Sequence, residues 1–251
     1  MRVVICIKPV IDNYSTQAQQ LNKKGYAVNP YDQLVLKQLL EIKKKQNFEL
    51  IGLCMGSMKC QDMLFRLLAG GVDSIILLSD MAFAGADTYA TTEVLSKALI
   101  RIGNVDYIFC GAKAIDGETG QVPYELAHRL NIPVINNVSN IMSMDGDGLQ
   151  LERQLDDLVQ EEIIASPAVI IGKHFTTEEF TVSLLSLKRA KNKKMIIWNH
   201  ERLELLPENC GIAGSKTKVK KAREINRFRK GEIMKGELNL VSQEMLKIIK
   251  G

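Results

Sequence analysis

The chain has 251 residues, of which 46% are hydrophobic and 25% charged, values typical of a globular protein with a substantial core. No apolar run reaches the about 18 residues of a membrane span, and the run at 3–7 is too short for a signal peptide. We therefore expect a cytoplasmic protein that is not an integral membrane protein. Five cysteines without a CxxC pair, and three histidines far apart in sequence, predict neither a disulfide framework nor a metal site.

The N-terminal half alternates short apolar runs with longer amphipathic segments. Strands are predicted at 3–7, 50–55, 74–78 and 107–110, and helices at about 31–46, 59–70, 88–102 and 121–130. This alternation predicts βαβ units and a parallel sheet with helices on both faces. Right-handed crossovers place the carboxyl ends of such strands at one edge, where ligands bind in open α/β sheets.

The pattern changes after Pro133. Residues 134–144, 149–155 and 163–171 are strand-like, and the DGDG sequence at 145–148 predicts a β-hairpin between the first two. We expect this antiparallel piece to extend or flank the parallel sheet.

The chain is basic from residue 188 and lacks periodicity from about residue 199. Residues 188–230 contain 14 Lys or Arg against four Asp or Glu, and a final amphipathic helix is predicted at 237–250. A long structureless stretch inside one compact domain is improbable. We therefore expect a compact domain over 1–198 and an extended arm over 199–251 that packs on a partner.

Small-residue loops follow the four predicted parallel strands, at 8–12, 55–57, 82–92 and 111–122, and neither GxGxxG nor GxxxxGK[ST] is present. Backbone N–H groups at the helix starts after the last three of these loops, at 56–57, 85–88 and 117–121, would attract phosphate oxygens. For any one loop, helix capping is favoured by about two to one, and Asp87 could be a plain N-cap. Four such loops at one edge favour a nucleotide, with 111–122 as one wall of its site.

Several segments are similar, in this order and spacing, to the β subunit of electron-transfer flavoproteins. They are RVVICIKPVID (2–12), NPYDQLVLKQLLEIK (29–43), LCMG (53–56), LLAGGVDSIILL (67–78), CGAKAIDGETGQVPYELAHRLNIP (110–133), LERQLDD (151–157), SPAV (166–169) and SLLSLKRAKNKK (183–194). The resemblance implies a flavodoxin-like (Rossmann-like) sheet for the nucleotide-binding domain at 1–198 and a C-terminal arm and helix that pack on an α subunit. It implies an electron carrier without catalytic side chains of its own.

The resemblance also implies a cofactor site. Its residues would be Cys6, Asn29, Pro30, Asp32, Met55, Gly56, Ala114, Asp116, Gly117, Glu118, Thr119, Gly120, Gln121 and Val122. In most family members the nucleotide here is AMP with a structural role. In an electron-bifurcating subgroup it is FAD, and the hallmark of that subgroup resembles DMAFAGADTYAT at 80–91, where Asp87, Thr88 and Thr91 would contact the diphosphate. We expect FAD, with AMP as the alternative.

By the same resemblance, the chain would accept hydride from NADH. One electron would pass to the α-subunit FAD and an acyl-CoA or 2-hydroxy-acid dehydrogenase, and the other to ferredoxin or flavodoxin. Leu184 would anchor the dehydrogenase, with Lys188 and Arg189 beside it. A nucleic-acid-binding role for 188–230 is the remaining alternative, but its aromatics are few (Trp198 and Phe228), so we expect no nucleic acid partner.

Overall fold

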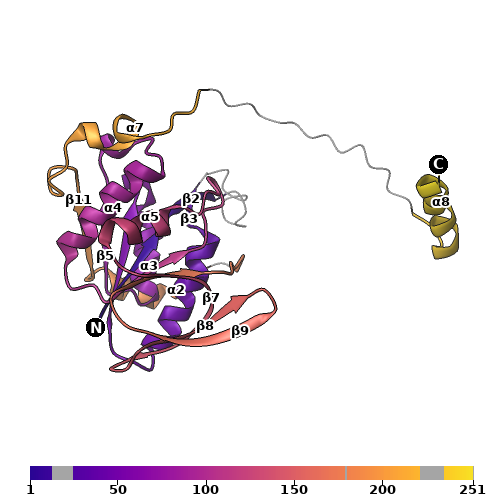
Figure 1. Ribbon diagram of the computed structural model, residues 1–251, viewed down its shortest axis with the longest axis horizontal. Coiled ribbons are helices and arrows are strands. Elements are labelled where there is room, and N and C mark those ends of the chain that lie inside the picture. Colours follow the sequence, from indigo (N-terminus) through magenta and orange to yellow (C-terminus); the bar gives the residue numbers. More distant parts are fainter. Residues whose placement is uncertain (13–24, 179, 221–234, 251) are drawn as a thin grey trace. The chain divides into compact units, whose positions relative to one another are not determined.

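The computed structural model describes residues 1–12, 25–178, 180–220 and 235–250 (Figure 1). They fall into two units, Met1–Lys218 and Val219–Gly251. The second unit contains α8 (Leu238–Lys250), in agreement with the helix predicted there. The first unit includes residues 199–218, which were expected to belong to the arm, and Leu203, Leu205 and Cys210 are buried in it. No helix in the described ranges is long and apolar enough to cross a membrane.

A nine-stranded sheet forms the centre of the first unit, in the order β11-β5-β4-β1-β6-β10-β7-β8-β9. Its parallel strands are β1 (Arg2–Ile7), β4 (Glu49–Met55), β5 (Ser74–Leu78), β6 (Tyr107–Gly111), β10 (Ala168–Gly172) and β11 (Lys194–Trp198). The predicted parallel sheet is therefore confirmed. Its central strands are continuous apolar runs because both faces are covered, as the complete burial of Val3, Val4 and Ile5 indicates.

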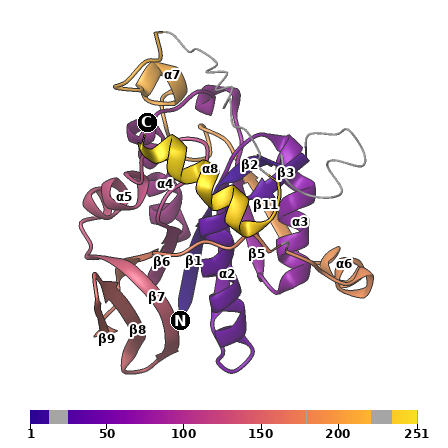
Figure 2. The same ribbon diagram turned by 90° about the vertical axis from the view of Figure 1, so that its right-hand side faces the viewer.

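Helices cover both faces of this sheet, as expected (Figures 1 and 2). One core cluster joins the sheet to α2 (Pro30–Lys43), α3 (Gln61–Gly70) and α6 (Leu184–Ala190). The other joins it to α4 (Thr88–Ile102) and α5 (Val122–Leu130), and includes Trp198, Leu203 and Leu205. Figure 2 shows α4 and α5 on one side of the strands and α2 and α3 on the other.

The antiparallel part extends the sheet at one end. β7 (Val134–Asp145) pairs in parallel with β10 at its start and then forms the predicted hairpin with β8 (Gly148–Leu155). The single strand predicted at 163–171 is wrong, because β9 (Leu158–Ile164) ends before Pro167 and β10 begins after it. β9 pairs with β8 at the sheet edge, whereas β10 lies between β6 and β7. One continuous strand cannot occupy both places.

Short elements gather where the parallel strands end. β2 (Pro9–Asp12) and β3 (Gly25–Val28) form a small antiparallel sheet after β1. The 3-10 turns η1 (Met58–Cys60) and η2 (Met81–Phe83) follow β4 and β5, and η3 (Pro207–Asn209) and α7 (Gly211–Gly214) follow β11. In Figure 2 the N-terminus, at the start of β1, lies at the edge opposite α7. The carboxyl edge is therefore where loops from many strands meet.

Candidate functional site

Asn29 holds together two loops at the carboxyl edge. Its side chain is 1% exposed; Nδ2 donates to the carbonyl of Lys113 (2.9 Å), and Oδ1 accepts from the N–H of Ile115 (3.2 Å). Its own N–H donates to the carbonyl of Lys8 (3.0 Å). Asn29 therefore fastens the loop after β6 to the end of β1, while Pro30 begins α2 in the first turn, where its missing N–H costs nothing.

Asp32 makes a second link between the same strands. It is 6% exposed; Oδ2 accepts from the N–H of Lys8 (2.9 Å) and Oδ1 from the N–H of Gly111 (3.1 Å). Burial raises the pKa of Asp32 to about 6, although hydrogen bonds from Lys8, Asn29 and Gly111 oppose the rise. A Cβ at position 111 would lie 2.5 Å from Asp32 Oδ1 and 2.8 Å from its backbone N, so this position requires glycine.

The loop predicted to be one wall of the nucleotide site, 111–122, is exposed at 115–119 and at 121 and at least partly buried elsewhere. Glu118 and Gly120 adopt positive φ angles of 54° and 63°, and the Lys8 ammonium binds the Asp116 carboxylate (2.5 Å). The loop ends at Gln121, whose side chain caps no N–H of α5. The first N–H groups of a helix have no partner within it, and they attract anions. The start of α5, at Val122, is therefore open to a phosphate.

The loops after β1 and β4 also meet. The Gly56 N–H donates to the carbonyl of Leu78 (3.0 Å), and a Cβ on Gly56 would lie 2.9 Å from Pro9 Cγ. The turn that follows Met55 thus packs directly on the segment after β1. Cys6, half-buried at the end of β1, is hydrogen-bonded to Cys110, and this bond together with burial raises the pKa of the Cys110 thiol.

The loop after β5 leads into α4 and is tied to α5. Asp87 is the N-cap of α4, and its Oδ1 accepts from the N–H of Ala90 (3.0 Å). The capping role considered for this residue is thus confirmed, and its contact with a diphosphate stays a prediction. The Thr88 hydroxyl donates to Glu125 Oε1 of α5 (2.8 Å), and Thr91 is half-buried one turn into α4. The amino-terminal ends of the two helices are therefore neighbours.

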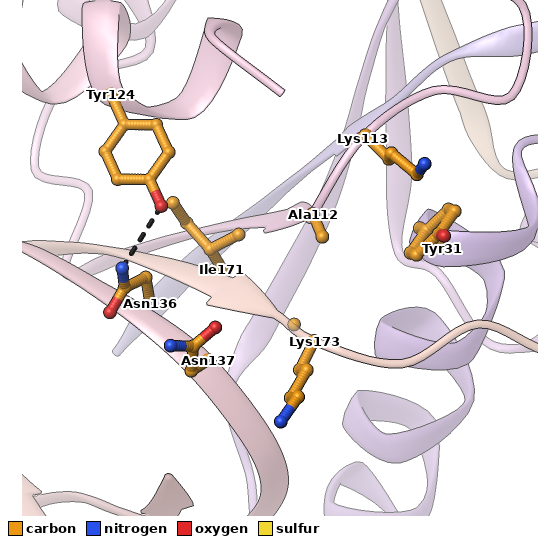
Figure 3. Close-up of a pocket in the computed structure, with 9 residues that line it drawn as sticks. Tyr31, Ala112, Lys113, Tyr124, Asn136, Asn137, Ile171 and Lys173 are labelled. Carbon is orange, nitrogen blue, oxygen red and sulfur yellow. Dashed lines mark hydrogen bonds between the residues drawn. The ribbon is translucent and has the colours of Figure 1, made fainter. Parts of the chain in front are cut away.

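A pocket of about 250 Å³ lies beside this site, at the ends of β6 and β10 (Figure 3). Lys113 and Lys173 are among its lining residues, and their ammonium groups contact Glu118 (3.5 Å) and the carbonyl of Gln154 (3.4 Å), respectively. The hydroxyl of Tyr124 accepts from Asn136 Nδ2 (3.2 Å). Its lining residues are Tyr31, Ala112, Lys113, Tyr124, Asn136, Asn137, Ile171, Gly172 and Lys173. Sequence reasoning missed the pocket because the lining comes from separate elements that share no motif.

Arg153 orients one wall of this pocket. From β8 its Nε and Nη2 donate to the backbone carbonyl and side-chain oxygen of Asn136, each at 2.9 Å. Its Nη1 pairs with Glu162 on β9 at 2.7 Å. The antiparallel extension of the sheet thus supports a site at the edge of its parallel part.

The predicted docking residues lie on a separate helix. Leu184 begins α6 and is 79% exposed, and the Ser183 hydroxyl caps the helix by accepting from the N–H of Ser186 (3.1 Å). Lys188 and Arg189 occupy the last turn. In Figure 2, α6 lies beside α3, away from α5 and the loop that precedes it. An exposed leucine followed by basic residues is suited to a transient protein contact.

Comparison with known proteins agrees with the sequence resemblance. The family model described as "Electron transfer flavoprotein domain" matches residues 20–193. The chain is 33% identical to the electron transfer flavoprotein subunit beta of Thermoanaerobacterium thermosaccharolyticum, over 98% of this chain and 96% of the relative. It is also 33% identical to subunit CarD of the caffeyl-CoA reductase–Etf complex of Acetobacterium woodii, over 87% and 86%. Identity to the acryloyl-CoA reductase electron transfer subunit gamma of Anaerotignum propionicum is 30%, over 88% of each chain.

Proposed function

This chain belongs to the electron transfer flavoprotein family as a β-type subunit, and we propose that it binds FAD at the carboxyl edge of its sheet. The observation that carries the proposal is the meeting of the starts of α4 and α5, joined by the 2.8 Å hydrogen bond from Thr88 to Glu125. Two neighbouring helix starts can each receive one phosphate group. This arrangement suits the diphosphate of FAD better than the single phosphate of AMP, which needs only one of them.

The chain's own residues would bind and orient the nucleotide. The backbone N–H groups of Val122 and Tyr124 in α5 (Pro123 between them has none) and those of Thr88 and Tyr89 in α4 would hold the phosphates. Asn29 and Asp32 would not contact the nucleotide themselves but would position the loop at 111–122, because their polar atoms hydrogen-bond to its backbone. When bound, FAD would supply the redox chemistry by accepting a hydride and releasing electrons singly.

The relatives suggest partners. Two of them carry the names of caffeyl-CoA reductase and acryloyl-CoA reductase assemblies. We propose that this chain pairs with an α subunit that holds its own FAD and works with an acyl-CoA or 2-hydroxy-acid dehydrogenase. NADH would be the donor and ferredoxin or flavodoxin the second acceptor. The alternative is a subunit that holds AMP structurally while the α subunit carries the sole flavin.

The nucleotide content of the purified heterodimer tests this proposal. We expect two FAD and no AMP per dimer when the chain is co-expressed with its α subunit, denatured, and its released nucleotides separated and counted. As a matched control, the α subunit expressed alone is expected to retain one FAD. One FAD plus one AMP would establish the alternative, and a dimer without any β-bound nucleotide would contradict both assignments.

Leu184 provides a test of dehydrogenase docking. We expect Leu184→Ala to slow electron transfer to the dehydrogenase by roughly 10-fold or more, because truncating an interface anchor costs about 2 kcal/mol. The measurement is the rate of dehydrogenase reduction at limiting concentration. Flavin content should stay constant, since the side chain is 79% exposed and lies outside the site. Leu158→Ala, at a leucine 72% exposed on β9, is the matched control, and equal rates for both variants would rule out the anchor role.

A further inference from the structure

The loop between β5 and α4 is hydrogen-bonded to a later part of the chain, the end of β11 and the residues that follow it. β11 pairs with β5, and the Ser79 N–H donates to the carbonyl of Trp198 (3.0 Å). One step further on, the backbone N–H and Nδ1 of His200 both contact Asp80 Oδ2, at 3.0 and 2.6 Å. Partial burial raises the pKa of Asp80, but hydrogen bonds from Ala82 and His200 outweigh this effect and keep the pKa below its usual value. The loop is thus fixed at its first residue.

Residues 210–217, here called the clasp, then close over the rest of the loop. Gly211 has a φ of 51°, and a Cβ there would lie 2.3 Å from the carbonyl oxygen of Ala82. On the loop side, a Cβ on Gly85 would lie 2.5 Å from Ile212 Cγ1. The Ile212 N–H donates to the carbonyl of Ala84 at 3.1 Å. Gly211 therefore permits a close backbone approach that a larger residue would block, and Gly85 leaves room for the Ile212 side chain.

The clasp ends on Asp87 itself. The buried Ser215 hydroxyl donates to the carbonyl of Gly211 (2.7 Å) and accepts from the N–H of Asp87 (2.9 Å). The N–H and hydroxyl of Thr217 donate to Asp87 Oδ2 at 2.7 and 2.9 Å. Because Oδ1 already caps Ala90, both oxygens of this carboxylate are engaged. Asp87 is therefore a positioning residue, and the N–H groups of Thr88 and Tyr89 are left to face a phosphate.

We propose that Ser215 and Thr217 are further positioning residues of the nucleotide site, which set the first turn of α4 through Asp87 and thereby raise the affinity for a diphosphate-containing nucleotide. This inference rests on the proposed function. The clasp ends one residue before Lys218, the last residue of the first unit. Binding free energies are reciprocal, so a nucleotide that gains affinity from the clasp must also stabilise it.

Substitutions in the clasp test the inference on the intact heterodimer, stripped of nucleotide and titrated with FAD. Thr217→Val and Ser215→Ala are each expected to weaken FAD binding about 10-fold, the effect of one lost charge-assisted or buried hydrogen bond. Thr217→Ser keeps the hydroxyl and should restore the affinity. Ser143→Ala removes a hydroxyl that contacts Gln150 in the hairpin (3.3 Å) and should leave the affinity unchanged.

A second readout separates positioning from general stability. Addition of FAD to the wild-type heterodimer should slow amide hydrogen exchange across 210–217, and Thr217→Val should reduce that slowing. Thr217 is exposed, so this variant tests the inference even if Ser215→Ala fails to fold. Wild-type affinity in Thr217→Val, within twofold, together with unchanged exchange at 210–217, would overturn the inference alone. A wild-type dimer whose β subunit binds neither FAD nor AMP would overturn the proposed function and the inference with it.

Discussion

Replacing Gly111 with alanine is expected to destabilise the protein by roughly 3 kcal/mol and to lower its nucleotide content at least about 10-fold. The new Cβ would meet Asp32 Oδ1 at 2.5 Å, Tyr31 Cβ at 2.6 Å and the Asp32 backbone N at 2.8 Å. All three atoms lie at the start of α2, and Tyr31 Cβ and the Asp32 backbone N cannot swing away as the end of a long side chain could. Relief of the clash would separate β6 from α2 and move the loop that begins at Gly111.

Two measurements check this expectation. Denaturant unfolding gives the loss in the free energy of unfolding, and nucleotide counting on the heterodimer gives the effect on the site. Gly146→Ala is the matched control, because no atom lies within 4 Å of a Cβ at that hairpin position. It should change stability by no more than about 0.5 kcal/mol. If Gly111→Ala behaves like the control, the tight contact between Gly111 and Asp32 is not what holds the loop.

The stability of the wild-type protein should fall as the pH rises through the range in which Asp32 ionises. The Asp32 pKa is raised from 3.8 to about 6, so between these values the folded protein holds a proton that the unfolded chain has lost. The stability contributed by protonated Asp32 is therefore present below pH 3.8 and is lost as pH rises through about 6. The shift corresponds to roughly 3 kcal/mol, as expected for a fully buried carboxyl.

Comparison with Asp32→Asn isolates this effect. The amide cannot titrate, and its NH₂ group would face the N–H of Lys8 or of Gly111, so the variant should be less stable at every pH. The free-energy difference between wild type and variant should shrink by roughly 2 kcal/mol between pH 4 and pH 7, because part of the total change already falls below pH 4. Asp116→Asn removes a half-exposed carboxylate from the same edge and is the matched control. An equal pH dependence in both comparisons would show that burial of Asp32 is not its cause.

The parallel core could be predicted because its strands are buried on both faces. Val3–Ile5 and the runs in β4, β5 and β6 are continuous apolar stretches between amphipathic helices, a pattern typical of parallel sheets in α/β proteins. The loops at 55–57, 82–92 and 111–122 could be placed at one edge from topology alone. The hairpin followed from the turn sequence at 145–148.

The parts that sequence reasoning missed depend on contacts between distant residues. β11 has only four apolar residues, Met195–Trp198, directly after the basic run at 188–194, so its sequence is too short a signal for a strand; in the fold it is an edge strand in which Ile196 and Ile197 are 40% and 46% exposed. Residues 199–218 lack periodicity because only a few side chains, such as Leu203 and Leu205, reach the core. The pairing of His200 with Asp80 joins residues 120 positions apart. No local pattern encodes such a pairing, since only the fold brings the two together.

The clasp has a consequence for the order of events during synthesis. Thr217 follows Asp87 by 130 residues, so β5 and α4 leave the ribosome long before the segment that fixes the loop between them. At the usual pace of translation this interval is on the order of 10 s. Throughout it the nascent chain offers the loop at 80–87 without His200, Ser215 or Thr217. Under the proposed function, a full-affinity site would first exist once Thr217 has left the ribosome, so cofactor loading would be completed only after that point.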